Sequence, residues 1–313
     1  MTELHGRIIK GVGGLYDVRL TDGGVRDVIS CRAKGILRRG DEKLYVGDLV
    51  TVTSDKDTPD GIVIASCLPR KNCLIRPPLS NLDFLLIVLS PANPAPVLST
   101  VDKLTAIAEH NGITPVIVIT KADIDRGEAE RIAGIYRSAG FTAFVTSSSD
   151  GSGTEELHKY TEENIKDGRC AAFAGASGVG KSTLMNRLFP SLSLATSDIS
   201  RRIGRGRHTT RHVELYDITD DPVHTGFLAD TPGFSLIDFE RFDFFSLDDL
   251  LPAFRDIMPY TGHCRYSDCA HVGEGEDECA VARAAKEGRI AESRLSSYRE
   301  IYKILKAKRD GFR

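Results

Sequence analysis

The stretch GASGVGKST, Gly175–Thr183, follows the apolar run CAAFAG and opens the amphipathic run KSTLMNRLF. It satisfies the pattern G-x-x-x-x-G-K-[ST], in which the glycines let the main chain curl so that its N–H groups point at an anion. Lys181 would place a positive charge at the β- and γ-phosphates of a nucleotide, and the Ser182 hydroxyl can ligate Mg²⁺. A glycine-rich turn with a chance Lys-Ser pair is the alternative, but the flanking strand and helix favour a nucleoside triphosphate site. The candidate contacts are Gly175, Ala176, Ser177, Gly178, Val179, Gly180, Lys181, Ser182 and Thr183.

The residues around this loop predict an α/β domain from about residue 71 to residue 240. Apolar runs such as NLDFLLIVLS and TPVIVIT alternate with helical patterns at 101–112, 128–140 and 155–166. Two more strand-like runs, HVELYDI and HTGFLAD, follow the phosphate loop. Strands that alternate with helices at this spacing indicate a mainly parallel sheet that is covered on both faces.

A candidate base-reading loop, Thr120-Lys121-Ala122-Asp123, follows the apolar run VIVI. The Asp123 carboxylate can accept two hydrogen bonds from the guanine N1–H and N2–H₂ groups, and the stem of Lys121 can lie across the base. The motif alone is weak, since Lys-Ala-Asp is also a plausible helix start. Its position at the end of a buried strand favours the guanine interpretation. The next strand ends in further pocket candidates: Thr146, Ser147 and Ser148.

The order of these motifs is unusual, because in most nucleotide-binding G domains the phosphate loop precedes the base-reading loop. Here the order is base-reading loop, pocket loop, phosphate loop and then the run Asp230-Thr-Pro-Gly233. Asp230 can hold Mg²⁺ through water, and the Gly233 N–H can sense the γ-phosphate. Ligands bind at the carboxyl ends of parallel strands whichever strand comes first, so the order predicts a circularly permuted G domain. The chain then continues from the γ-phosphate sensor directly into the C-terminal region. This connection suggests how a change at the γ-phosphate could be transmitted to the next domain.

The segment DISRRIGRGRHTTRHVELY between phosphate loop and Asp230 is rich in Gly, Arg and hydroxyl groups. It is either a disordered surface loop or a switch, in which Thr209 or Thr210 ligates Mg²⁺ and becomes ordered with GTP. Phe234 occupies the position where many G domains have a Gln that orients water, so slow intrinsic hydrolysis is expected. His208, or less favourably His212, is the nearest candidate to replace that Gln.

A Cys/His cluster lies in HCRYSDCAHVGEGEDEC, with the spacing C-x₄-C-x-H-x₇-C. Three thiolates and one imidazole make a closed tetrahedral zinc set, which is the structural type of site and leaves no position for water. Buried thiols are the alternative, but this stretch is too polar for a core, and His263 is a competing ligand. The expected zinc ligands are Cys264, Cys269, His271 and Cys279.

The N-terminal 70 residues alternate short strand-like runs with Gly and Asp turns, which predicts an all-β, OB-like barrel. After about residue 240 the chain is acidic and aromatic, then Cys-rich, and it ends in an amphipathic helix expected at about 280–308. The net charge is −3 and no apolar run spans a bilayer. Seven cysteines and a polar N-terminus favour a cytoplasmic protein over a secreted one.

Together, TKAD before GASGVGKS, then GRGRHTTRH, DTPGF and the Cys/His set, resemble the ribosome small subunit-dependent GTPase A family. The resemblance implies an OB-fold-like RNA-binding domain at 1–70, a circularly permuted GTPase domain at 71–240, and a mainly helical zinc-binding domain with a C-terminal helix at 241–313. It further implies GTP/GDP, Mg²⁺ and one structural zinc ion as cofactors. The implied activity is GTP hydrolysis stimulated by the small (30S) subunit during its late maturation, with 16S ribosomal RNA as a partner.

For that activity the expected catalytic residues are His208, Lys181 and Thr210, with Ser182 and Thr210 on magnesium. No membrane partner is expected, and the protein is expected to be a monomer. Thr120 stands where many G domains have Asn, so the loop should lack one buttressing amide, and the x₇ gap is longer than is usual in the family. Two other functions remain: an RNA-binding protein whose nucleotide site does not turn over, and a P-loop ATPase.

Overall fold

The computed structural model describes residues 3–21, 27–35, 37, 43–55, 61–189, 213–218, 226–230, 239 and 241–311. The chain divides into two compact units, each assembled from three separate stretches. The first unit comprises Met1–Phe84, His158–Phe173 and Met185–Phe234. The second comprises Leu85–Leu157, Ala174–Leu184 and Ser235–Arg313. Within the described residues, no helix is both long and apolar enough to cross a membrane.

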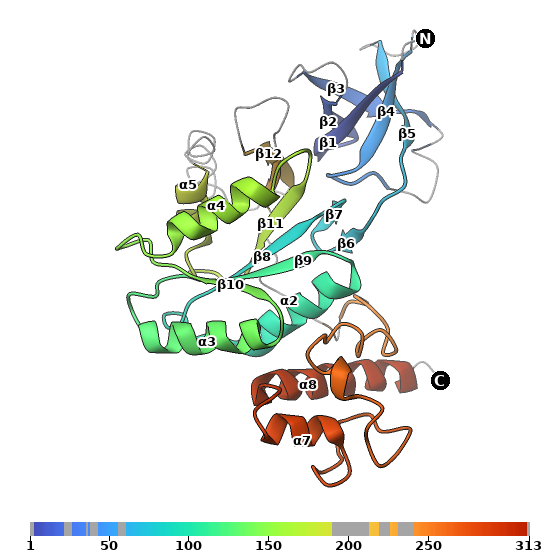
Figure 1. Ribbon diagram of the computed structural model, residues 1–313. Helices are drawn as coiled ribbons and strands as arrows, with labels where there is room; N and C mark the ends of the chain where they lie inside the picture. Colours follow the sequence, from blue (N-terminus) through green and yellow to red (C-terminus); the bar gives the residue numbers. More distant parts are fainter. Residues whose placement is uncertain are drawn as a thin grey trace. The chain divides into compact units, whose positions relative to one another are not determined.

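Five strands of the first unit form a closed barrel, which confirms the expected OB-like domain (Figure 1, blue). Their order is β1-β2-β3-β5-β4, and an antiparallel β1–β4 pairing closes the sheet. Buried side chains such as Val18 of β2, Cys31 of β3, and Val50 and Val52 of β4 fill the barrel interior. The strands are β1 (Leu4–Val12), β2 (Leu15–Leu20), β3 (Val28–Ala33), β4 (Leu49–Ser54) and β5 (Ile62–Cys67).

Strand β1 was not identified from the sequence, because its run LHGRIIKGV mixes polar residues and glycines with few apolar ones. Contacts in the folded chain explain the glycine at position 6 and the arginine at position 7. A Cβ on Gly6 would lie 2.7 Å from the Arg19 carbonyl oxygen of β2, so only glycine fits there. Arg7 is buried, and its guanidinium lies 5.0 Å from the centre of the Phe227 ring.

The chain beyond β5 remains attached to the barrel through the buried carboxylate of Asp48. This carboxylate accepts hydrogen bonds from the Tyr45 N–H (2.7 Å), the Arg70 Nε (2.7 Å) and the Ser80 hydroxyl (2.6 Å). Such charge-assisted bonds offset the cost of burying the charge. They fix a short hairpin made of β6 (Cys73–Ile75) and β7 (Pro78–Ser80) against the barrel.

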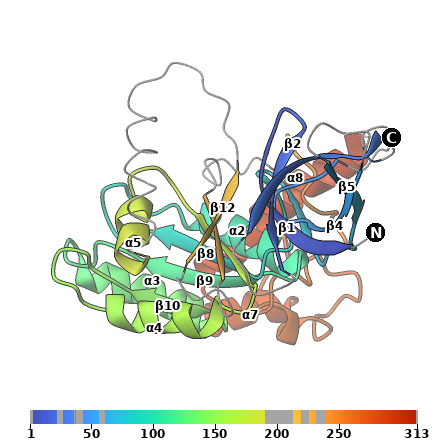
Figure 2. The ribbon, with the colours of Figure 1, turned by 90° about the horizontal axis from the view of Figure 1, so that it is seen from above.

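Three further strands of the first unit continue the sheet from β1. β11 (Cys170–Ala174) pairs in parallel with β13 (Phe227–Asp230), and β12 (Glu214–Asp217) pairs antiparallel with β13. β12 also pairs with β1, where Lys10 lies opposite Glu214 and their side chains form an ion pair at 3.1 Å. Figure 2 shows β12 and β1 from above.

The second unit contains strands β8 (Phe84–Leu89), β9 (Thr114–Ile119) and β10 (Thr142–Val145), in the order β10-β9-β8. β9 and β10 run parallel, as expected, and every residue of β8 is buried. Helices α2 (Leu98–His110) and α3 (Arg126–Ser138) lie along one face of these strands (Figure 1). Two more helices, α4 (Thr154–Asn164) and α5 (Lys181–Leu188), follow the pocket loop and the phosphate loop.

The C-terminal helix expected at 280–308 is divided in two, so that expectation is wrong in detail. A 3₁₀ turn, η2 (Met258–Tyr260), precedes α7 (Ala280–Lys286) and α8 (Glu292–Gly311). Gly288 adopts φ of +75°, a left-handed conformation that ends α7. The break lets α8 contact both α7 and α2, and Lys103 of α2 forms an ion pair with Glu300 of α8 at 2.6 Å.

A fully buried arginine joins α8 to the rest of the second unit. The Arg294 Nη1 donates to Asp102 Oδ1 (2.9 Å), and its Nη2 and Nε donate to Asp256 (2.7 and 3.0 Å). The guanidinium lies between the rings of Phe141 and Phe254, 5.3 and 4.7 Å from their centres. Burial alone would lower the Arg294 pKa, but attraction to the two carboxylates outweighs it and raises the pKa above its ordinary value. The arginine therefore stays charged and links three segments of the chain.

Candidate nucleotide-binding site and metal centre

The phosphate loop leaves β11 and curls before α5, as the glycine pattern predicts. Gly175, Gly178 and Gly180 have φ of +137°, +81° and +94°, a region that glycine alone enters readily. At Gly175 a Cβ would also lie 2.1 Å from the Val88 carbonyl oxygen. The turn against β8 therefore depends on glycine for space as well as for conformation.

Lys181, Ser182 and Thr183 begin α5, where the helix N-terminus favours negative charge. The Lys181 Nζ donates to the carbonyl oxygens of Gly175 (2.7 Å) and Ala176 (2.6 Å), so it folds back over the loop. Burial lowers the Lys181 pKa. Ser182 and Thr183 are exposed, which leaves the Ser182 hydroxyl accessible to a ligand.

The base-reading loop lies directly against the phosphate loop, although 59 positions separate Thr120 from Val179. The Thr120 hydroxyl lies 2.5 Å from the Val179 carbonyl oxygen, and the Lys121 Nζ donates to the Gly178 carbonyl at 2.7 Å. Lys121 has φ of +53°, which turns the loop sharply after β9. The structure thus brings together the two motifs that the sequence places far apart.

Asp123 is exposed and held by the pocket loop after β10. The Ser147 hydroxyl donates to Asp123 Oδ1 at 2.6 Å, and hydrogen bonds from Ser147 and Ser149 lower the Asp123 pKa. The carboxylate is therefore ionised at neutral pH, as acceptance of two guanine hydrogen bonds requires. Thr146 is buried and donates its hydroxyl to the Ile119 carbonyl (3.1 Å), whereas Ser148 is half-buried.

Other expected site residues fall where the structure gives no side-chain description. Asp230 ends β13, and its side chain lies outside the described part of the structure. The switch candidates His208, Thr209 and Thr210 and the sensor Gly233 also lie outside the described residues.

One loop and one glycine that the sequence did not single out help to shape the candidate site. The loop SPANPAP after β8 offers the Asn93 carbonyl, which accepts a hydrogen bond from the Lys121 Nζ at 2.8 Å. In the pocket loop, a Cβ on Gly153 would lie 2.0 Å from the Val145 carbonyl oxygen, and φ is +66°. In the sequence, the first is marked only by a proline-rich turn after a buried strand, and the second only by a glycine two residues after Gly151. Both features are common in loops, so neither one indicates a site.

The Cys/His set converges in the second unit, where its four ligand atoms lie within 4.8 Å of one another. The His271 Nδ1 is 3.5 Å from the Cys264 Sγ and 3.4 Å from each of the Cys269 and Cys279 Sγ atoms. The sulfurs of Cys264 and Cys279 are 3.9 Å apart. Tetrahedral zinc, with Zn–S near 2.3 Å and Zn–N near 2.0 Å, requires separations of roughly 3.5–3.8 Å. The set therefore fits a zinc ion, while His263 is exposed and outside it.

A bound cation would change the protonation of these ligands. Burial raises the pKa of Cys269 to about 12 and lowers the pKa of His271, which keeps the imidazole neutral, as a metal ligand must be, whereas the Cys269 thiol needs a cation to offset the cost of a buried thiolate. The backbone of the ligand loop is fixed by α8. Arg299 Nε donates to the His271 carbonyl (3.0 Å), and the Tyr298 hydroxyl to the Ala270 carbonyl (3.3 Å).

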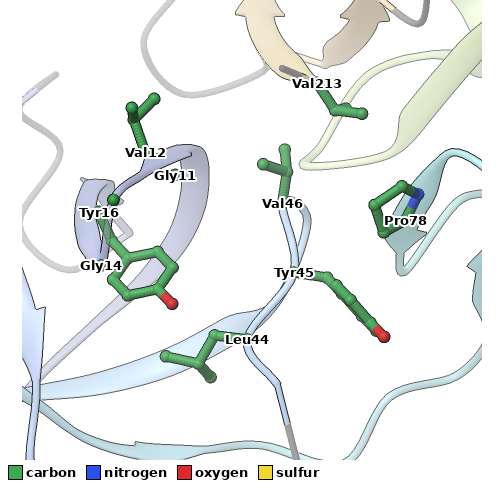
Figure 3. A pocket seen from close by; sticks show the side chains of 10 residues that line it. Gly11, Val12, Gly14, Tyr16, Leu44, Tyr45, Val46, Pro78 and Val213 are labelled. Atoms are coloured by element: carbon green, nitrogen blue, oxygen red, sulfur yellow. The ribbon is translucent and has the colours of Figure 1, made fainter. Parts of the chain in front are cut away.

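A surface hollow of about 240 Å³ lies elsewhere, in the first unit (Figure 3). It is formed by the β1–β2 turn, residues 44–46 of the barrel, Pro78 and Val213. Apart from the hydroxyl groups of Tyr16 and Tyr45, its side chains are apolar, so it offers no charged group for a phosphate.

Comparison with known proteins agrees with this arrangement. Residues 67–240 match the domain family described as RsgA GTPase, and residues 5–63 match the RsgA N-terminal domain. The chain belongs to the RsgA GTPase family. Its relatives include the small ribosomal subunit biogenesis GTPase RsgA of Alkaliphilus metalliredigens, which is 38% identical over 97% of this chain and 98% of its own. The RsgA of Caldanaerobacter subterraneus subsp. tengcongensis is 36% identical over 98% of both chains.

Solved structures of similar proteins support the same fold for this RsgA GTPase family member. YloQ, described as a circularly permuted GTPase, is 31% identical and superposes with a TM-score of 0.74 over 98% of this chain and 96% of its own. YjeQ from Thermotoga maritima is 30% identical, with a TM-score of 0.77 over 97% and 99%. The expected barrel, permuted G domain and helical Cys/His region are therefore confirmed, and the chain is a GTPase of the RsgA family.

Proposed function

We propose that this chain hydrolyses GTP in a manner stimulated by the small (30S) ribosomal subunit, and that it assists late maturation of that subunit. Membership of the RsgA GTPase family supports the reaction, and the names of its relatives support the setting in small-subunit biogenesis. The observation that carries the proposal is the direct contact between the base-reading loop and the phosphate loop. One guanine nucleotide can lie across both loops only if they are adjacent.

In this proposal the chain's own residues bind and orient the nucleotide. The ionised Asp123, held by Ser147, accepts hydrogen bonds from the guanine edge, and Lys121 lies along the base. On binding, the Lys181 ammonium exchanges its two carbonyl partners for the β- and γ-phosphates. The remaining proposed contacts are Thr120, Thr146, Ser147 and Ser148 at the base, Gly175–Thr183 at the phosphates, and Asp230 and Gly233 beyond them.

The residues present also suit a magnesium ion. The exposed hydroxyl of Ser182 at the start of α5 and the hydroxyl of Thr210 would hold it, and the ion would neutralise phosphate charge when bound. His208 is proposed to replace the Gln that Phe234 displaces, so intrinsic hydrolysis would be slow. The barrel and the zinc centre are proposed to contact 16S ribosomal RNA, with the protein acting as a cytoplasmic monomer.

The test is GTP turnover by the full chain, titrated with purified small subunits and repeated with excess ATP. We expect turnover to rise steeply with subunits and to be insensitive to ATP. A Ser182→Ala variant is the control, because it should bind nucleotide but lose Mg²⁺-dependent turnover. GTP binding without any subunit-stimulated turnover would favour an RNA-binding protein with a structural nucleotide site, and inhibition by ATP would favour an ATPase.

A further inference from the structure

The histidine of the Cys/His set has an unusual backbone conformation within the ligand loop, residues 264–279. His271 adopts φ of +62°, in the left-handed region that residues with a Cβ seldom enter. The residue is also buried, with 4% of its surface exposed. Such a conformation persists only where the surrounding structure holds it. The contacts of this turn therefore identify what keeps the ligand in place.

Two adjacent residues of α8 hold the carbonyl groups of this turn. The Arg299 Nε donates to the His271 carbonyl oxygen at 3.0 Å. Among the described residues, no other group donates a hydrogen bond to that oxygen. The Tyr298 hydroxyl donates to the preceding carbonyl, that of Ala270, at 3.3 Å. The carbonyl side of the left-handed residue therefore depends on α8.

The ligand atom of His271 has little freedom to compensate for a change in the backbone. All three cysteine sulfurs face its Nδ1, at 3.4–3.5 Å. Nδ1 is the ring nitrogen nearer to the backbone, and only χ1 and χ2 position it. A metal–ligand distance tolerates deviations of only about 0.2 Å. A rotation of the backbone at residue 271 would therefore move the ligand atom away from the ion.

Arg299 also brings a positive charge to the metal centre. The three thiolates outweigh the two charges of Zn²⁺, so the occupied site is an anion. The Arg299 side chain is half-buried, and within the described part of the chain no carboxylate forms an ion pair with it. Its guanidinium is therefore available to stabilise the anionic site, which favours retention of the metal.

We propose that Arg299 is a positioning residue for zinc: its hydrogen bond holds His271 in the left-handed conformation that directs Nδ1 at the three sulfurs, and it thereby slows zinc release. The inference goes beyond the proposed GTP turnover, because it concerns how long the metal stays bound. The same helix carries Arg294, whose ion pair with Asp102 of α2 at 2.9 Å fixes α8. Zinc retention thus depends on a helix that is anchored outside the ligand loop.

The test measures zinc release from the full chain into an excess of a chromophoric chelator. Arg299→Met approximates the length of the side chain but removes the donor and the charge, whereas Arg299→Lys retains both. Arg283→Met is the matched control, because the Arg283 Nε also donates to a backbone carbonyl of the ligand loop, that of Glu276 at 3.1 Å, but this residue is not a ligand. We expect Arg299→Met to release zinc about tenfold faster than the unaltered chain. Arg299→Lys should stay within about threefold of the unaltered chain, and Arg283→Met within about twofold.

A second variant makes the test independent of whether Arg299→Met folds. Tyr298→Phe removes only the hydroxyl that donates to the Ala270 carbonyl. The ring remains packed edge-on against Phe254, with the ring centres 5.4 Å apart. Because the lost hydrogen bond is longer than that of Arg299, we expect about threefold faster zinc release. Release from Tyr298→Phe at the rate of the unaltered chain would count against the hold that α8 has on the turn.

A spectroscopic readout separates positioning from general destabilisation. The d–d absorption of cobalt(II), bound in place of zinc, reports the ligand geometry. It should change in Arg299→Met and not in Arg283→Met, while the far-UV circular dichroism of the two variants stays alike. Release from Arg299→Met as slow as from the unaltered chain would overturn the inference, as would equally fast release from Arg283→Met. An unaltered chain that bound no zinc would refute the metal centre and this inference with it, but not the proposed GTPase function.

Discussion

Replacing Arg294 by methionine is expected to lower the free energy of unfolding by about 3–5 kcal/mol. Methionine can fill the space between the rings of Phe141 and Phe254, so the loss is mainly electrostatic. The substitution leaves Asp102, whose side chain is fully buried, and Asp256, whose side chain is 5% exposed, without their charged partner. Uncompensated buried carboxylates, rather than the lost bonds themselves, account for most of that magnitude.

The loss should depend on pH in a defined direction. Burial raises the pKa of Asp102 in the folded chain, against the opposing charge of Arg294. Protonation of Asp102 therefore favours folding, and its stabilising effect disappears as the pH rises through the folded-state pKa. Removal of Arg294 raises that pKa further, so the deficit of the variant should be smaller at pH 5 than at pH 8.

The assay is urea unfolding followed by far-UV circular dichroism, at both pH values. Arg309→Met, on the same helix with a side chain that is 54% exposed, is the control and should cost less than about 1 kcal/mol. Adding Asp102→Asn to the Arg294 variant should restore part of the stability, because it removes one uncompensated charge. A loss below about 1 kcal/mol for Arg294→Met, or a deficit that grows at low pH, would refute the reasoning.

Three more outcomes are expected. Gly175→Ala should weaken GTP binding at least about tenfold, because its Cβ would lie 2.1 Å from a carbonyl oxygen. Gly134→Ala, with open space around it, should leave GTP binding unchanged. Equal affinities of the two variants in a fluorescent-nucleotide titration would contradict this. Cys279→Ser should reduce zinc content, measured with a chromophoric chelator, while Cys67→Ser should leave it unchanged; undiminished zinc would exclude this ligand set. Asp123→Asn should weaken guanosine diphosphate binding and favour the xanthosine nucleotide in competition, and a variant that kept its guanine preference would remove Asp123 from base recognition.

The sequence alone was sufficient to predict those features whose residues all lie in one short motif. The phosphate loop requires glycines, a lysine and a hydroxyl in one short run, and the positive φ angles at Gly175, Gly178 and Gly180 follow from those residues. The cysteine spacing likewise brings thiols close together along the chain. The alternation of short strand-like runs with Gly and Asp turns predicted the barrel. Strand β1 was not predicted, because the contacts that explain Gly6 and Arg7 form only in the folded chain.

Tertiary structure decided the features that depend on partners far along the chain. The helical pattern of the sequence does not explain the burial of Arg294, which depends on its ion pair with Asp102, 192 positions away. The Thr120 hydroxyl gains its partner only when the phosphate loop arrives from 59 positions further on. The expected C-terminal helix is broken near Gly288 because α8 must pack against both α7 and α2. Local sequence patterns specify which loops, helices and strands form. Contacts between segments that are distant in the sequence determine which side chains are charged, buried or hydrogen-bonded.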